Sequence, residues 1–388
     1  QGDNMIINKA YKFRIYPSSE QKEIINKTFG CTRFIYNYYL NKKCELYKNN
    51  KQNISAYECI KDIPNLYNER PYLKEIDSCS LRCTLFDLDN SYNKFFKEKI
   101  GYPKYKNKYA KNSYRTNLIT STYKNKKYEN IKLDLINKEI TLPKLKKVKI
   151  RGYRNLKQIN GRIINATISR EVNNKYYVSI VYEENIIIQP IKQTKIIGID
   201  LGIKDLVITS DYEKYHNEKI LQKFEKRIKM YQRRLTKKVS GSNNYFKTKQ
   251  KLARLYTKLK NARKYIIHHI TKKITEENNI IVTENLTIKN MLKNHKLAKS
   301  LSDASLSEIT RQLAYKTKWK GKIMYKIDTY YPSSQICSKC GYKNEITKNL
   351  KIREYECPNC KSYLDRDYNA AINIMFEGIK KYMKEVII

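Results

Sequence analysis

Long apolar segments are missing from this sequence of 388 residues. No stretch approaches the roughly 20 apolar residues that a membrane-spanning helix needs, which excludes a membrane-spanning protein. Residues 1–16 alternate between polar and apolar side chains and contain no continuous apolar run, so we expect no secretory signal peptide there. The sequence therefore predicts a cytoplasmic protein.

Acidic residues are also scarce. The chain has 37 Asp and Glu against 80 Lys and Arg, a formal net charge of +43. An AT-rich genome would inflate Lys, Asn, Ile and Tyr, but it would supply acidic codons as well, so it explains the 35 tyrosines better than the charge. The excess is too large for an ordinary metabolic enzyme and favours nucleic acid as the partner. The length predicts at least two folded cores.

The nine cysteines fall into two groups. Five are scattered through the first hundred residues, where we expect small buried side chains: Cys31, Cys44, Cys59, Cys79 and Cys83. The other four form two Cys-x2-Cys pairs separated by sixteen residues: Cys337, Cys340, Cys357 and Cys360. This spacing predicts a zinc ribbon, in which each pair lies on a tight turn and offers two sulfurs to one tetrahedral ion. Two disulfides are the alternative, which the expected cytoplasmic location disfavours.

Helical and alternating periodicities divide the first half of the chain. Residues 9–16 alternate as a strand, and Ser18 stands before Gln21 at the spacing of a capping box, which predicts a helix start. Apolar residues then recur at three- and four-residue steps over 20–96, which predicts a helical bundle, broken by a turn-rich stretch over 49–71.

Residues 132–183 alternate in short runs between turn residues, which predicts a small antiparallel sheet or barrel. Residues 195–210 predict two further core strands, and 280–284 predicts a short buried strand. Residues 219–273 contain 19 Lys and Arg and one acid, keep a helical period and are interrupted at 240–244, which predicts a basic antiparallel helix pair.

A further amphipathic helix is predicted over 306–319. Ser305 and Glu308 have the spacing of a capping box at its start. We expect Asp303, just before them, to act as a local cap.

Residues 94–115 combine charge with aromatic side chains. Eight Lys and Arg stand there against Glu98, with six interleaved Phe and Tyr residues. This mixture suits phosphate contact together with base stacking. A solvated loop is the alternative.

Three carboxylates stand in apolar surroundings. Asp200 lies within IIGIDLGI, Glu284 ends IIVTE, and Asp367 precedes a helix start rich in small residues. An unpaired charge buried in such a setting costs several kcal/mol, so we expect these acids to share a cation site. Two Mg²⁺ ions held by carboxylates can hydrolyse a phosphodiester. Asp367 could instead be only a helix cap, and the neighbouring Asp365 competes for its role.

Several motifs, taken in order, resemble the TnpB family of transposon-encoded RNA-guided DNA nucleases, relatives of the type V CRISPR effectors. YKFRIYP, GCTRFIYNYYL and YNKFFKEKIGYPKYKNK are similar to the N-terminal part of the family. GIDLGIKDLVITSD, IIVTENL and DRDYNAAINI resemble its three RuvC motifs, and YYPSSQICSKCG with ECPNC resembles its zinc ribbon. The resemblance covers the chain almost from end to end.

The resemblance implies an α/β multidomain fold, with an RNase H-like RuvC nuclease domain that carries an inserted zinc ribbon and a wedge β-barrel split by a helical recognition domain. The implied boundaries are 5–18 and 119–192 for the wedge, 19–118 for the helical domain, 193–330 for the RuvC domain with its basic hairpin, 331–364 for the zinc ribbon, which contacts target nucleic acid, and 365–388 for the last RuvC segment.

The resemblance also implies a function. Asp200, Glu284 and Asp367 match the catalytic acids and two-Mg²⁺ ligands, and the four paired cysteines match the zinc ligands. The implied partners are a transposon-derived guide RNA and double-stranded target DNA beside a short flanking motif, in a prokaryotic, nucleoid-associated protein. Nucleic-acid contacts are predicted for Arg82, Phe86, Tyr114, Arg115, Thr116, Arg233 and Arg234.

Other functions stay open at this point. A strand-transferring transposase also uses three acids, and an RNA-guided repressor would have lost cleavage. An RNA chaperone and a eukaryotic or viral relative of the family are further alternatives.

Overall fold

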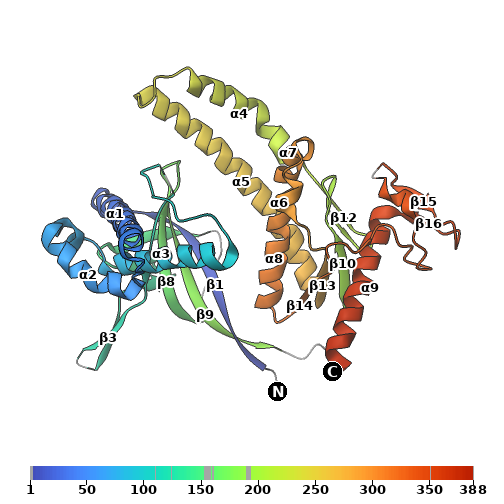
Figure 1. The fold of residues 1–388 in the computed structure, drawn as a ribbon, viewed down its shortest axis with the longest axis horizontal. Helices are drawn as coiled ribbons and strands as arrows, with labels where there is room; N and C mark the ends of the chain where they lie inside the picture. Colours follow the sequence, from blue (N-terminus) through green and yellow to red (C-terminus); the bar gives the residue numbers. More distant parts are fainter. Residues whose placement is uncertain are drawn as a thin grey trace. The chain divides into compact units, whose positions relative to one another are not determined.

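The protein is described by a computed structural model. It describes residues 3–109, 111–123, 125–152, 159, 161–188, 194–349 and 351–387. The chain divides into two units, one formed by Ile6–Asn185 and the other by Ile186–Ile388 together with Gln1–Met5 (Figure 1). Within the described ranges, no helix has the length and apolar character that crossing a membrane requires.

Three helices lie between the first two strands of the unit Ile6–Asn185: α1 (Ser19–Asn50), α2 (Ala56–Glu69) and α3 (Ser78–Glu98). The predicted start of α1 is confirmed, because Ser18 and Gln21 form a capping box. The predicted turn-rich break over 49–71 is wrong, because most of it forms α2. A second capping box, between Ser55 and Glu58, starts α2. Its buried stripe of Ala56, Cys59, Ile63 and Leu66 stabilises the helix although it contains Pro64.

A seven-stranded sheet completes this unit. Its strands are β1 (Asp3–Tyr16), β2 (Asn112–Asn117), β5 (Lys132–Asp134), β6 (Glu139–Leu142), β7 (Lys146–Arg151), β8 (Arg162–Arg170) and β9 (Tyr176–Ile188). The order is β2-β8-β9-β1-β7-β6-β5, and the pairs β2/β8, β8/β9, β1/β7, β6/β7 and β5/β6 are antiparallel. The antiparallel sheet predicted over 132–183 is therefore confirmed, and its closure into a barrel stays a prediction. Strands β3 (Thr120–Tyr123) and β4 (Lys126–Glu129) form a separate hairpin.

The other unit is built on a five-stranded sheet of order β12-β11-β10-β13-β14. Its strands are β10 (Ile196–Asp200), β11 (Asp205–Thr209), β12 (Lys214–His216), β13 (Ile280–Thr283) and β14 (Ile323–Lys326). The pairs β12/β11 and β11/β10 are antiparallel, whereas β13 runs parallel to both β10 and β14. The strands predicted over 195–210 and 280–284 are confirmed.

Helices cover both faces of this sheet (Figure 1). The helices of this unit are α4 (Ile220–Thr236), α5 (Asn243–Glu277), α6 (Ile288–Met291), α7 (His295–Ala304), α8 (Leu306–Trp319) and α9 (Arg366–Ile387). Since side chains alternate along a strand, Ile281 of β13 packs with α5, α7 and α8, while Ile280 and Val282 pack with Ile374 of α9. The helix predicted over 306–319 is confirmed.

The basic helix pair is confirmed as α4 and α5, which pack through a small core that includes Ile228 and Leu255. The predicted capping box at the start of α8 is wrong, because Ser305 has a left-handed backbone (φ 53°) and makes no side-chain cap, while Glu308 binds Arg311. Asp303 caps a different helix: its carboxylate accepts from the Leu221 amide of α4 at 3.2 Å and pairs with Arg263 of α5 at 2.6 Å.

Two short strands and a 3-10 helix occupy the segment between β14 and α9. They are η2 (Glu345–Lys348), β15 (Glu354–Glu356) and β16 (Tyr363–Asp365), with β15 antiparallel to β16. A 3-10 helix of the other unit, η1 (Pro71–Glu75), joins α2 to α3.

Candidate metal centres

Two of the predicted catalytic acids lie side by side at the carboxyl ends of parallel strands. The register pairs Ile199 of β10 with Thr283 of β13, so the next residues along the two strands are Asp200 and Glu284. Alternation places Gly198 and Asp200 on the face of the sheet that α9 covers, and it places Val282 and Glu284 there as well. Both carboxylates therefore face the helix that carries Asp367.

Helix α9 approaches this face very closely. A Cβ atom built on Gly198 would lie 2.0 Å from the backbone oxygen of Ala371, and one on Gly378 would lie 2.1 Å from Val282 Cγ2. Only glycine leaves room for helix and sheet at these two points. The first turn of α9 is thereby held over the ends of β10 and β13.

The three acids interact electrostatically. Burial raises the pKa of Asp200 well above its usual range, and the charges of Glu284 and Asp367 raise it further. Burial also raises the pKa of Glu284, although Ser333 Oγ donates a 2.7 Å hydrogen bond to its Oε1. Like charges are thus gathered in a poorly solvated place, an arrangement that a bound cation stabilises.

Asp365 and Asp367 have different surroundings. Asp365 caps α9, because its Oδ1 accepts from the amides of Asp367 and Tyr368 at 2.9 and 3.0 Å, and its Oδ2 accepts from Lys214 at 2.6 Å. Asp367 instead pairs with the guanidinium groups of Arg353 and Arg366 at 2.9 and 2.8 Å. The cap role that Asp367 could have had therefore belongs to Asp365, which leaves Asp367 available to the acidic site.

The acids are neighbours without forming a compact ligand cage. Within the described ranges, the groups of three or more Asp, Glu, His or Cys whose ligand atoms lie within 4.8 Å of one another include only the four paired cysteines. The two arginines hold the Asp367 carboxylate between them. Carboxylates are hard oxygen donors that fit Mg²⁺, and the assignment of Asp200, Glu284 and Asp367 as its ligands stays a prediction.

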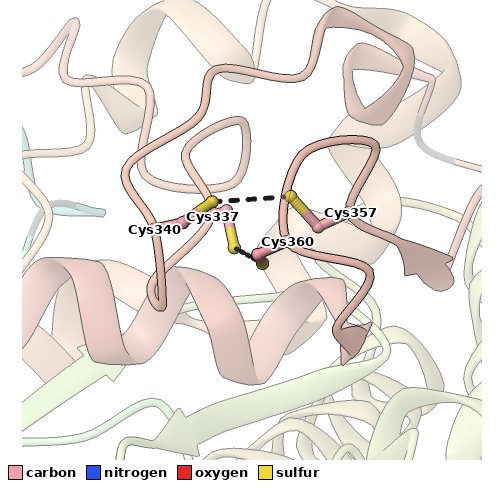
Figure 2. A group of neighbouring side chains, drawn as sticks. All are labelled: Cys337, Cys340, Cys357 and Cys360. Carbon is pink, nitrogen blue, oxygen red and sulfur yellow. Dashed lines mark hydrogen bonds between the residues drawn. The ribbon is translucent and has the colours of Figure 1, made fainter.

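The four paired cysteines converge on one point (Figure 2). Their Sγ atoms lie within 4.8 Å of one another, with 3.7 Å between Cys337 and Cys360 and 3.7 Å between Cys340 and Cys357. A tetrahedron of thiolates with Zn–S bonds of about 2.3 Å has edges of about 3.8 Å, so this donor set fits zinc. The structure thus brings together all four residues that the spacing singled out.

Each cysteine pair lies on the same kind of turn. The amide of the residue after the second cysteine closes each turn: Gly341 donates to the Cys337 carbonyl at 2.8 Å, and Lys361 donates to the Cys357 carbonyl at 2.9 Å. Both donors have a left-handed backbone, with φ of 76° and 58°. The two turns are therefore equivalent, with glycine in one and lysine in the other.

Two buried asparagines of α9 fasten the cysteine-bearing segment to the helix. Asn369 Nδ2 donates to the Ile336 carbonyl at 2.7 Å, and its Oδ1 accepts from the Ser338 amide at 2.8 Å. Asn373 Nδ2 donates to the Ser333 carbonyl at 2.8 Å. The helix that carries Asp367 thus also positions the cysteine centre.

Sequence reasoning missed several residues around the acids. Lys214, Ser333 and Arg353 bind Asp365, Glu284 and Asp367, respectively. Ser333 lies within the motif YYPSSQICSKCG and Arg353 lies between the two cysteine pairs, but neither position indicates a contact to a carboxylate, and Lys214 belongs to no motif.

The predicted nucleic-acid contacts lie in different environments. Arg82 is exposed on α3, Phe86 packs edge-on against Tyr57, and Arg115 pairs with Asp87 at 2.8 Å. Arg233 and Arg234 line a groove of about 420 Å³ on α4, whose other lining residues are Lys226, Lys229, Met230 and Lys237. Tyr114 and Thr116 are buried, 6% and 1% exposed, so their side chains are not accessible to a nucleic acid in this structure.

Models of three protein families match the chain. The model described as "Probable transposase" (OrfB_IS605) matches residues 179–295, and "Cas12f1-like, TNB domain" matches 307–374. A model described as "Helix-turn-helix domain" matches 5–52, which in this structure form most of β1 and helix α1.

A solved structure has the same fold. The protein in "Cryo-EM structure of the Cas12f1-sgRNA-target DNA complex" superposes with a TM-score of 0.61 at 16% identity, covering 95% of this chain and 99% of that one. At this identity the likeness concerns the fold alone.

Full-length relatives carry consistent names. A "Putative RNA-guided DNA endonuclease" of Streptomyces pristinaespiralis is 31% identical over 377 residues, which cover 96% of this chain and 90% of the relative. The "Putative RNA-guided DNA endonuclease InsQ" of Escherichia coli K12 is 28% identical over 387 residues, covering 95% and 92%. The order of the motifs, the matching family models and these end-to-end alignments agree, and the chain belongs to the TnpB family of transposon-encoded proteins.

Proposed function

We propose that this protein is an RNA-guided DNA endonuclease that cleaves DNA with Mg²⁺ in a RuvC-type site. The observation that carries the proposal is the convergence of Asp200 and Glu284, adjacent on parallel strands, with Asp367 on the helix that covers them. The names of the relatives from Streptomyces and Escherichia coli support it.

The carboxylates of Asp200, Glu284 and Asp367 would hold two Mg²⁺ ions. When bound, these ions supply an activated water and stabilise the leaving oxygen of the phosphodiester. Ser333 orients Glu284 by bonding Oε1, which leaves Oε2 available as a ligand. Arg353 and Arg366 balance the charge of Asp367 and hold its carboxylate in place before the cations bind.

The four paired cysteines would hold one Zn²⁺ ion with a structural role. A four-thiolate site leaves no open position for substrate, which separates it from a catalytic zinc site. Because Asn369 and Asn373 fasten this segment to α9, the zinc centre would stabilise the segment that supplies Arg353 to the acidic site.

Guide RNA and double-stranded DNA are the proposed partners. The net charge of +43 and the cationic groove on α4 suit a backbone-reading protein, with base pairing to a transposon-derived guide supplying sequence choice. The solved relative named above was determined with sgRNA and target DNA. We further propose Arg82, Phe86 and Arg115 as contacts to the flanking motif. The domain boundaries that the resemblance implies are likewise proposed for this chain.

The central experiment compares variants of single acids. The protein is purified with RNA from its own locus, the bound RNA is sequenced, and cleavage of a matching duplex is measured with Mg²⁺. Asp200→Ala should lower cleavage more than about 100-fold and leave target binding in place. Undiminished cutting would refute the role of Asp200.

Asp365→Asn is the matched control. It removes the charge that pairs with Lys214 but keeps an oxygen that can cap α9, and it removes no proposed metal ligand. Below its unfolding temperature this variant should cleave, whereas Asp367→Asn should behave like Asp200→Ala. If Asp365→Asn lost cleavage and Asp367→Asn kept it, Asp365 would be the third metal ligand.

A strand-transferring transposase is the second candidate, favoured by the description of the family model that matches residues 179–295. Incubating the protein with transposon-end DNA and no helper protein separates the two functions. Joined transposon and target strands would favour the transposase, and cut but unjoined target favours the nuclease.

A further inference from the structure

The hairpin of β3 and β4 presents two aromatic side chains on one face. The register pairs Tyr123 with Lys126 and Ser121 with Tyr128. Because opposite residues share a face and alternate residues return to it, Tyr123, Lys126 and Tyr128 all lie on the same side. The two tyrosines are diagonal neighbours, about 7 Å apart at the backbone, close enough to form one surface.

These side chains project into solvent instead of packing in a core. Tyr123 is 64% exposed and Tyr128 is 48% exposed, and Lys126 is exposed between them. No residue of the two hairpin strands is buried. A two-stranded hairpin on its own is marginally stable, and a pair of exposed tyrosines adds at most about 1 kcal/mol to it. Their arrangement is therefore better explained by a ligand than by packing.

The opposite face of the hairpin has a different character. It carries Thr120, Thr122 and Lys127, and the ammonium of Lys127 pairs with Glu129 at 3.1 Å. On the tyrosine face, the ammonium of Lys126 has no ion-pair partner among the residues that the structure describes. The tyrosine face thus combines two aromatic rings with an uncompensated positive charge.

The base of the hairpin is fixed to the seven-stranded sheet. Asn130 Oδ1 accepts from the Ile119 amide at 2.7 Å, and its Nδ2 donates to the Asn117 carbonyl at the end of β2 at 3.1 Å. The Leu118 amide donates to the Ile164 carbonyl of β8 at 2.9 Å. Because these bonds restrain the hairpin at both strands, the tyrosine face has a defined direction relative to the sheet.

We propose that Tyr123, Lys126 and Tyr128 form a stacking platform for two successive unpaired nucleotides of a bound strand. Tyrosine rings stack on any base, and a lysine beside them neutralises a phosphate, which together favour single strands without strong sequence preference. The platform rests on the nucleic-acid binding in the proposed function, but it needs neither the acids nor a cut. RNA and DNA share the chemistry that it recognises, and the experiment separates them.

Photo-crosslinking tests the platform at the residue level. The whole protein, without divalent cations, is irradiated with short single-stranded RNA or DNA that contains 5-iodouracil, and the crosslinked peptides are identified by mass spectrometry. We expect crosslinks at Tyr123 or Tyr128. The nucleic acid that gives the higher crosslink yield, RNA or DNA, is the one that the platform binds in the functional protein. Signal from duplex alone would overturn the proposal, because paired bases offer no free face.

Variants of the two faces give matched controls. Tyr123→Ala with Tyr128→Ala should remove the hairpin crosslink and weaken binding of the preferred strand about fivefold or more, since each stacked base contributes at least that factor. Thr120→Ala with Thr122→Ala, on the opposite face, should change neither, and Tyr123→Phe with Tyr128→Phe should keep the affinity. Equal losses on both faces would overturn the platform.

Failure of this inference differs from failure of the proposed function. Crosslinks found only outside residues 120–129, with unimpaired binding, would overturn the platform and leave the nuclease proposal intact. A protein that binds no single strand in any arm would also overturn the platform, and the cleavage experiment with the protein's own RNA then decides the nuclease proposal separately.

Discussion

The two candidate metal centres of this protein are assembled in opposite ways. The four cysteines lie within one short segment, on two turns closed by their own backbone hydrogen bonds, and their sulfurs already lie at zinc-like spacing. The three acids come from β10, from the end of β13 and from α9, far apart in the chain. A local motif can form its site early, whereas the acidic site exists only once the sheet and α9 have packed.

The centres also differ in how strongly their ligand side chains repel one another. Neutral thiols can share a small volume, but carboxylates repel one another, and burial together with that repulsion raises the pKa of Asp200. In the acidic centre, Arg353 and Arg366 form ion pairs with the Asp367 carboxylate. The comparison predicts that zinc contributes to folding. It also predicts that Mg²⁺ reduces the repulsion between carboxylates whose positions the fold has already set.

The largest expected effect concerns the cysteine centre. Cys357→Ser should abolish zinc binding and unfold the turns around it, because structural zinc contributes apparent binding free energies of about 10–16 kcal/mol. Zinc content and limited proteolysis of the segment 331–364 measure the effect. Cys44→Ser is the control, since Cys44 lies in the other unit, where it contacts Tyr92 and Tyr102, and its change should leave zinc content unchanged. A Cys357→Ser protein with full zinc would contradict the four-thiolate site.

The next effect concerns the packing that builds the acidic centre. Gly198→Ala should lower the free energy of unfolding of the unit Ile186–Ile388 by about 2 to 3 kcal/mol, because the new Cβ would meet the Ala371 carbonyl at 2.0 Å. Urea unfolding measures it. Gly30→Ala in α1 meets nothing within 4 Å and should stabilise its helix by up to about 1 kcal/mol. A neutral Gly198→Ala would mean that α9 does not lie this close to β10.

A smaller effect tests the electrostatic half of the comparison. Because the pKa of Asp200 is raised on folding, its charged form costs stability at every pH above the usual aspartate pKa. Asp200→Asn should therefore raise the free energy of unfolding of the metal-free protein, by about 1 kcal/mol, and should lose the stabilisation that Mg²⁺ gives. Thermal unfolding with chelator and with excess Mg²⁺ measures both. Lower stability with chelator would show that the charge is compensated by contacts within the protein.

The smallest effect compares the two cysteine turns. Lys361 has a left-handed backbone, which costs a non-glycine residue roughly 1–2 kcal/mol, so Lys361→Gly should stabilise the zinc-bound protein by up to about 1 kcal/mol. Gly341→Ala at the equivalent position should have the opposite sign. Competition with a zinc chelator measures both changes, and the same sign for the two would show that the turns are not equivalent.

Local signals in the sequence predicted local structure well. The capping box at Ser18 and the alternation of β6 to β9 are short-range patterns whose physics acts between near neighbours, and the structure confirms them. Patterns failed where a distant partner decided the outcome. Ser305 has the spacing of a cap, but its backbone is left-handed. Asp303 caps α4, a helix that lies far from it in the sequence.

By itself the sequence determined which four cysteines form a cluster, the excess of positive charge and the family, because spacing, charge and motif order are properties of the chain alone. Only the tertiary structure decided which carboxylate caps α9, which arginines bind Asp367, and that the tyrosines of β3 and β4 share a face with Lys126. Those outcomes depend on the exact geometry of a turn, a set of ion pairs and a hairpin register, which side-chain spacing alone does not fix. The convergence of Asp200, Glu284 and Asp367 depends in addition on packing between segments more than eighty residues apart, which no local pattern records.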